Sequence, residues 1–311
     1  MKTAFLFAGQ GAQTIGMGKE LCENFPIAAQ TYEEASDALG FDIQKMIFDG
    51  DSETLMITEN TQPAILTMSA AALRVAEQEL DVKPDVVAGL SLGEYTAHVA
   101  SGSLTFADAV KLVKKRGKYM QEEVPLGVGT MAAIIGLDAD TVREVCKAAS
   151  EKGIAEPANF NCPGQITVAG EIPAVEYACE LAKEKGARRA MLLSVSAPFH
   201  CSMLKGAGEK LAKELEHVTV SPMRIPLIAN VTGDYVKSDA EIKDLLIKQV
   251  SHSVLFENSL RLMLDDGVDT FVELGPGKAL SGFVKKITKD VTVCNIEDMA
   301  SLAKAIESLK G

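Results

Sequence analysis

Residues 86–100 read VVAGLSLGEYTAHVA, an apolar run that changes into a helix-forming run through a serine set between two glycines. The part up to Gly89 has the length and valine content of a buried strand, and the part after Gly93 favours a helix. The G-x-S-x-G turn between them predicts a nucleophile elbow, which lifts the hydroxyl of Ser91 into the open. Taken alone, the five residues also fit a glycine turn followed by an N-cap serine.

The segments around this turn alternate in the same way up to about residue 123. Short apolar runs such as TAFLFAG (3–9) are followed by longer helical patterns such as TQPAILTMSAAALRVAEQEL (61–80). This alternation is typical of a parallel sheet covered by helices. The first part of the chain is therefore predicted to be α/β.

From residue 127 the order changes to strand (129–137), helix (140–153), a hairpin through 162–165, helix (174–186) and strand (187–196). This is the βαββαβ order of a ferredoxin-like unit. After Pro198 the alternation of helices and strands seen in the first part of the chain returns, with a long helix, a strand at 224–231, a helix near 247–264 and a strand at 269–275. The smaller unit, residues 125–197, is thus predicted to be inserted into a larger domain made of 1–124 and 198–311.

Composition excludes several classes of protein. No window approaches the roughly 18 uncharged apolar residues of a membrane helix, and the start, MKTAFLFAGQG, reaches glycine too early for a signal peptide. The six cysteines show no metal-ligand spacing, which suits a reducing compartment. A net charge of −12 argues against nucleic acid as a partner. We expect a soluble cytoplasmic protein that needs no metal and contacts no membrane.

A nucleophilic serine needs a base, and the chain has four histidines. His98 lies about 10 Å along the same helix from Ser91 and is expected to be a packing residue. His217 ends a charged helix and is expected to face solvent, and His252 is expected to be a cap or surface residue. His200 lies at the junction of the two predicted units, where pockets form, and is the predicted base.

Seven motifs make the chain resemble the malonyl-CoA:acyl carrier protein transacylase family over nearly its full length. They are FLFAGQGAQ (5–13), TENTQPAIL (58–66), GLSLGEYTA (89–97), KRGKYMQ (115–121), ANFNCPGQ (158–165), SAPFHC (196–201) and VELGPGK (272–278). The resemblance implies an α/β-hydrolase-like domain with a ferredoxin-like insertion. Leu90 replaces the histidine of the usual GHSxGE, and Ala8 replaces the proline of the usual FPGQG. Neither departure removes a reacting group.

The family mechanism implies a ping-pong transfer without a tightly bound cofactor. Ser91 would attack the thioester of malonyl-CoA while His200 takes its proton, and the phosphopantetheine thiol of the carrier protein would then attack the malonyl-serine ester. The resemblance places the oxyanion hole at the N–H groups of Gln10 and Leu92 and assigns the orientation of the histidine to a main-chain carbonyl, that of Gln249. The GQGAQT stretch (9–14) also resembles a dinucleotide-binding fingerprint, but it has threonine in place of the third glycine. We therefore do not expect it to bind a nucleotide.

Arg116 lies on an apolar helical stripe with Ala109, Val113 and Met120, whereas nearby lysines fall away from it. It should therefore point inward, where a buried guanidinium needs a carboxylate partner. That partner is either an acid of the chain such as Glu94 or, as the resemblance implies, the free carboxylate of the malonyl group. An acetyl thioester, which lacks this carboxylate, would then be rejected.

The resemblance also places Met120, Asn161, Phe199 and Gln249 at the substrate pocket, with Phe199 typical of the malonyl-selective form. An acidic acyl carrier protein would need a local basic surface on this acidic chain, which we expect to act as a monomer. Two candidate surfaces are Lys183, Lys185, Arg188 and Arg189, and Lys285, Lys286 and Lys289. Two other classes stay open: a serine hydrolase or thioesterase, and a non-catalytic binding module on the same fold.

Overall fold

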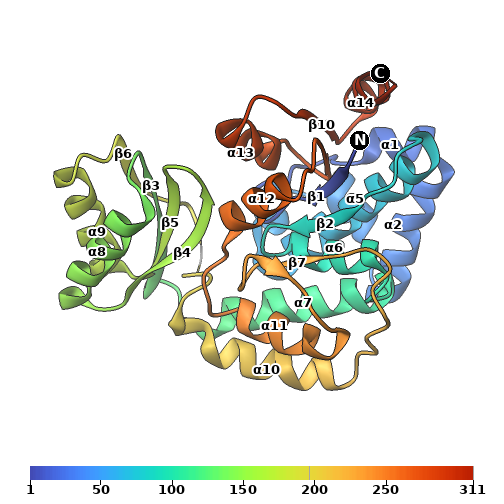
Figure 1. Ribbon diagram of the computed structural model, residues 1–311. Helices are drawn as coiled ribbons and strands as arrows, with labels where there is room; N and C mark the ends of the chain where they lie inside the picture. The colour runs from blue at the N-terminus through green and yellow to red at the C-terminus, as the bar shows by residue number, and fades with distance from the viewer. Residues whose placement is uncertain (196, 311) are drawn as a thin grey trace.

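Four parallel strands form the sheet that carries the elbow. The computed structural model describes residues 1–195 and 197–310, and in it the strand order is β10-β9-β1-β2 (Figure 1). These strands are β1 (Thr3–Phe7), β2 (Val86–Gly89), β9 (Thr270–Leu274) and β10 (Thr292–Ile296). Because Phe7 pairs with Gly89, the carboxyl ends of β1 and β2 lie side by side, and the loops that follow them meet.

Three helices around this sheet position the site. The long α5 (Thr58–Glu79) is buried along most of its length and packs against α7 (Phe106–Glu123), while α6 (Gly93–Ser101) continues directly from the elbow. This part also contains α1 (Lys19–Asn24), α2 (Pro26–Leu39), α3 (Ile43–Asp49), α4 (Ser52–Met56), α10 (Lys205–Glu216), α11 (Ile242–Gln249), α12 (Phe256–Asp265), α13 (Ala279–Ile287) and α14 (Met299–Leu309), with 3₁₀ turns at Ser202–Leu204 and Asp239–Glu241.

The second sheet is antiparallel, with the strand order β4-β5-β3-β6. Its elements are β3 (Gly129–Ile135), α8 (Ala139–Ala149), a 3₁₀ turn (Ser150–Lys152), β4 (Ala155–Cys162), β5 (Gln165–Glu171), α9 (Ile172–Glu184) and β6 (Arg189–Leu192). Both helices pack against one face of the sheet (Figure 1). The predicted βαββαβ order is confirmed; the boundaries of the insertion, 125–197, enclose all four strands and stay a prediction.

Side chains alternate across this second sheet, as the strand period of two requires. Ala132 and Ile134 of β3 and Phe160 of β4 belong to the core under α8 and α9. Met131 and Asn161, which are neighbours of these residues in the chain, instead line a pocket on the opposite face. One face of the sheet therefore makes a core, and the other faces the parallel-sheet part of the molecule.

Three predicted elements differ from the structure. The helix expected near 247–264 is two helices, because residues between α11 and α12 leave the helix to pair with β4, where Val254 N–H donates to the Ala158 carbonyl over 2.8 Å. The strand expected at 224–231 shrinks to β7 (Ile228–Ala229), which pairs with β8 (Asp234–Tyr235). Leu227, just before it, forms only a single bridge to Val87 of β2. The last strand of the insertion is shortened to β6, and of its predicted span Ser196 lies outside the described residues.

Within the described ranges, no helix combines the length and the apolar character that crossing a membrane requires.

Candidate active site

Ser91 lies in a strained turn between β2 and α6. Its φ of 53° is left-handed, a region that residues with a side chain rarely enter. The glycines on either side make the turn possible: a Cβ on Gly89 would overlap the backbone of Gly93, and a Cβ on Gly93 would overlap the carbonyl oxygen of Phe7. The Ser91 N–H is held by the side-chain oxygen of Asn230 at 2.6 Å. The local geometry is that of a nucleophile elbow.

His200 faces this serine from the segment after β6. Its Nε2 lies 2.6 Å from Ser91 Oγ, and its Nδ1 lies 2.8 Å from the main-chain carbonyl oxygen of Gln249. Because a carbonyl oxygen only accepts, Nδ1 carries the proton and Nε2 is left to accept from the serine hydroxyl. Burial, helped by the charge of Arg116, lowers the pKa of His200 to about 3. The imidazole is therefore neutral at physiological pH, as a general base must be.

The other three histidines lie away from Ser91 Oγ in the roles expected of them. His98 is fully buried in α6, and its Nδ1 lies 2.8 Å from Ser103 Oγ. His217 and His252 are exposed, and His252 Nδ1 lies 2.8 Å from the Lys248 carbonyl.

Arg116 points inward from α7, as its place on the apolar stripe predicts, and is 1% exposed. One terminal nitrogen donates to Gln62 Oε1 at 2.9 Å, and the other donates to Gln249 Oε1 at 2.9 Å and to Ser91 Oγ at 3.2 Å. Among the described residues these bonds include no direct ion pair with Glu94, which reaches the guanidinium only through Gln249. The Nε hydrogen has no acceptor among the described residues.

A pocket of about 720 Å³ opens between the two sheets and contains these groups. Of the predicted site residues, it is lined by Gln10, Ser91, Arg116, Met120, Asn161, Phe199 and His200. Leu92 and Gln249 are fully buried behind the lining. Within the described part of the chain, the main-chain N–H groups of Leu92 and Gln10 donate to no backbone carbonyl, as the expected oxyanion hole requires.

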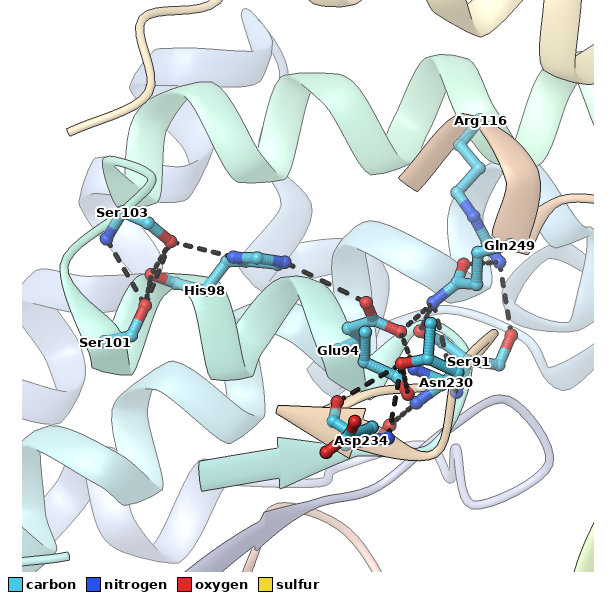
Figure 2. A network of polar contacts seen from close by, with 12 residues as sticks. Ser91, Glu94, His98, Ser101, Ser103, Arg116, Asn230, Asp234 and Gln249 are labelled. Carbon is cyan, nitrogen blue, oxygen red and sulfur yellow. Dashed lines mark hydrogen bonds and ion pairs between the residues drawn. The ribbon is translucent and has the colours of Figure 1, made fainter. Parts of the chain in front are cut away.

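A buried polar network behind the pocket was not predicted from the sequence (Figure 2). Asn230, directly after β7, accepts from the Ser91 N–H, and Gln62 of α5 accepts from Arg116, yet no sequence pattern predicts either contact. The sequence suggests Glu94 only as an ion-pair partner for Arg116. Gln62 lies inside the TENTQPAIL motif, which was the available signal; Asn230 ends an apolar run in the way that many loop residues do.

Comparison with known proteins identifies the family of the chain. A family model described as an acyl transferase domain matches residues 4–309. A malonyl CoA-acyl carrier protein transacylase of Bacillus subtilis is 47% identical over 310 residues, which cover 99% of this chain and 98% of that protein.

Solved structures show the same fold. The malonyl CoA-acyl carrier protein transacylase of Clostridium perfringens superposes with a TM-score of 0.97 at 49% identity, covering 100% of this chain and 98% of that one. A malonyl-transacylase in complex with its type II polyketide synthase acyl carrier protein superposes with a TM-score of 0.96 at 40% identity, covering 99% of each chain. The elbow, the histidine and these relatives together show that the chain belongs to the malonyl CoA-acyl carrier protein transacylase family of acyl transferases.

Proposed function

We propose that this protein transfers a malonyl group from malonyl-CoA to the phosphopantetheine thiol of an acyl carrier protein, through a malonyl ester of Ser91. One observation carries the proposal. The hydroxyl of Ser91 lies 2.6 Å from a neutral histidine nitrogen and 3.2 Å from a buried guanidinium, all in one pocket. A nucleophile, its base and an anion receptor are thus preassembled.

In the first half-reaction Ser91 Oγ attacks the thioester carbonyl and His200 Nε2 takes the hydroxyl proton. The tetrahedral oxyanion is stabilised by the N–H groups of Gln10 and Leu92. As the intermediate collapses, the C–S bond breaks and the proton on His200 passes to the departing CoA sulfur. The second half-reaction runs this sequence in reverse, with the carrier thiol as the attacking group.

Arg116 supplies the specificity for a malonyl group. Its guanidinium is held by Gln62 and Gln249, both neutral, so its charge is not cancelled by a directly bonded carboxylate. The free carboxylate of a malonyl group offers the anion that a buried arginine needs. An acetyl thioester would enter the same pocket and leave the guanidinium without a charged partner.

The basic cluster at the end of α13, made of Lys285 and Lys286 on the helix and Lys289 just after it, is the better supported docking surface for an acidic carrier. All three side chains are exposed. Lys286 Nζ donates to Gln165 Oε1 on β5 at 2.7 Å, which ties α13 to the hairpin whose residues Asn161 and Thr167 line the pocket. In the other cluster, Lys183 lies on α9, Lys185 and Arg188 lie between α9 and β6, and Arg189 begins β6. The helix α9 covers the face of the second sheet that is turned away from the parallel-sheet part of the molecule (Figure 1).

The test is to mix the protein with malonyl-CoA alone and weigh it by intact mass spectrometry. We expect a malonyl adduct on Ser91 that persists in water and disappears when holo carrier protein is added. Release of free malonate without a carrier would indicate a hydrolase or thioesterase. No adduct and no turnover would indicate a binding module.

A further inference from the structure

Glu94 lies one helical turn after Ser91 in α6, and its carboxylate is buried at 1% exposure. One carboxylate oxygen, Oε2, accepts two hydrogen bonds: from the Asn230 N–H at 3.0 Å and from Gln249 Nε2 at 2.8 Å (Figure 2). The two donors come from segments that are far apart in the chain. A single oxygen atom therefore joins the residue after β7 to the last residue of α11.

Each of these two donors holds part of the elbow. Asn230 Oδ1 accepts from the Ser91 N–H at 2.6 Å, and Asn230 Nδ2 donates to the Gly89 carbonyl at 2.7 Å, so one side chain spans both sides of the turn. Gln249 Nε2 also donates to the Ser91 carbonyl at 2.9 Å. The position of the nucleophile thus depends on two residues that both bond to Glu94.

Gln249 reaches the two other reacting groups as well. Its side-chain oxygen accepts from Arg116 at 2.9 Å, and its main-chain oxygen lies 2.8 Å from His200 Nδ1. A primary amide has one accepting and one donating end, and a carboxylate oxygen only accepts. The Glu94 carboxylate and the Ser91 carbonyl therefore together hold the nitrogen of the Gln249 amide, and its oxygen faces Arg116. A flipped amide would set an NH₂ group against the guanidinium, donor against donor.

The other oxygen of Glu94 argues against a purely structural role. Oε1 faces His98 Nε2 at 3.9 Å, and neither atom has a hydrogen-bond partner in the described ranges. Burial raises the pKa of Glu94 to about 7 in spite of its two bonds. Glu273, another buried glutamate, differs: its two oxygens accept from Leu280 N–H at 3.1 Å and from Ser281 N–H at 2.7 Å.

We propose that Glu94 is a positioning residue for the malonyl transfer proposed above, on which this inference rests. Its carboxylate, as the charged one of the two acceptors that hold the Gln249 nitrogen, fixes the orientation of that amide and, through it, aims the Arg116 guanidinium at the substrate. Glu94 itself lies behind the pocket and touches no substrate. Its loss should therefore change the choice between malonyl and acetyl thioesters, which a loss of folded protein would not do.

The first experiment compares two variants of Glu94: methionine removes the side-chain oxygen that accepts from Asn230 and Gln249, and glutamine keeps such an oxygen without the charge. Glu94→Met should lower kcat/KM for malonyl-CoA about 100-fold, the effect of misplacing a reacting group by about 1 Å, and should lower the malonyl-to-acetyl preference at least tenfold. Glu94→Gln, whose amide oxygen can accept both bonds, should lower the preference only about fivefold, because a neutral acceptor binds less strongly than a charged one.

Glu273→Met is the matched control, since it removes a buried carboxylate that is outside the pocket lining and accepts from α13 instead. With melting curves recorded for every variant, it should leave the malonyl-to-acetyl preference unchanged. An unchanged preference in folded Glu94→Met overturns the inference. Should Glu94→Met fail to fold, Glu94→Gln takes its place, and an unchanged preference there overturns the inference in the same way.

A double-mutant cycle tests the route through Gln249. In a Gln249→Leu background, Glu94→Gln should lower the preference no further, because the amide that it orients is already absent. If the double variant instead lowers the malonyl-to-acetyl preference by the product of the two single-variant effects, the route through Gln249 is overturned. Wild-type protein that forms no malonyl ester would overturn the proposed function together with this inference, whereas a wild-type ester with an unchanged preference in the Glu94 variants would overturn the inference alone.

Discussion

The two walls of the pocket hold their side chains in different ways. On the parallel-sheet wall, Ser91 and Arg116 are each tied to other polar groups by several hydrogen bonds. On the antiparallel-sheet wall, Met131 contributes an apolar surface, and Asn161 Oδ1 is buried without a partner among the described residues. Ser91 and Arg116 are thus held in place by hydrogen bonds within the protein, whereas Asn161 keeps an unused acceptor that faces the pocket.

The largest effect should come from the centre of the parallel-sheet wall. Ser91→Ala removes the nucleophile and should abolish covalent malonylation, with the fold intact by its melting profile. The measurement is label transfer from malonyl-CoA to protein. Undiminished labelling of the variant would place the nucleophile elsewhere and remove the basis of the comparison between the walls.

The second-largest effect should come from replacing the proposed general base, His200. His200→Ala should slow acylation by roughly 10²- to 10⁴-fold, the usual contribution of general-base help, without preventing substrate binding. Single-turnover acylation by malonyl-CoA measures it. A loss below tenfold would move the base to another residue, and His252→Ala, an exposed histidine outside the pocket lining, serves as the control.

Arg116→Ala should affect activity toward malonyl-CoA and acetyl-CoA differently. Removing one partner of a buried ionic contact costs about 3–5 kcal/mol, so malonyl transfer should fall by roughly 10²- to 10⁴-fold while relative activity toward acetyl-CoA rises. The measurement is kcat/KM for both thioesters. An unchanged malonyl-to-acetyl preference in a folded variant would make Arg116 structural.

The antiparallel-sheet wall should respond more weakly. Asn161→Ala removes one hydrogen-bonding side chain that faces the pocket, and a single neutral hydrogen bond contributes about 0.5–1.5 kcal/mol. KM for malonyl-CoA should rise roughly 2- to 10-fold with little change in kcat. A drop in kcat as large as that of His200→Ala would show that both walls take part in the chemistry.

The smallest effect is expected at the surface. Charge reversal of Lys285, Lys286 and Lys289 should raise KM for an acidic carrier a few-fold and weaken its dependence on salt, because exposed charges act through screened attraction. Acylation by malonyl-CoA should not change. The matched control reverses Lys183, Lys185, Arg188 and Arg189. If the control alone responds, the carrier docks on the α9 side.

Local patterns predicted those features that neighbouring residues determine. The strand-turn-helix around Ser91 and the βαββαβ order both follow from short-range periodicity, and both are confirmed as structure. The inward direction of Arg116 followed from the spacing of apolar residues on one helix. These features need no information about distant parts of the chain.

Features that depend on distant pairing were not predictable in this way. Nothing near Val254 signals that it pairs with β4 and so breaks a helical pattern. Likewise, Asn230 bonds to an elbow 139 residues earlier in the chain. The contact between His200 and the Gln249 carbonyl was expected only from the family resemblance, because any main-chain carbonyl offers the same chemistry.

The left-handed backbone at the reacting residues has an evolutionary consequence. Ser91 has a φ of 53° and His200 a φ of 61°, both of which glycine would adopt without strain. Holding a residue with a side chain in this region takes about 1–3 kcal/mol of folding free energy. At Ser91, where a small side chain would be lost, selection for thermal stability alone would therefore favour glycine, and only selection for turnover opposes it. At His200, which is 3% exposed, glycine would also remove a buried ring and leave a cavity. Directed evolution that selects only for melting temperature would therefore be expected to give a more stable protein without transferase activity.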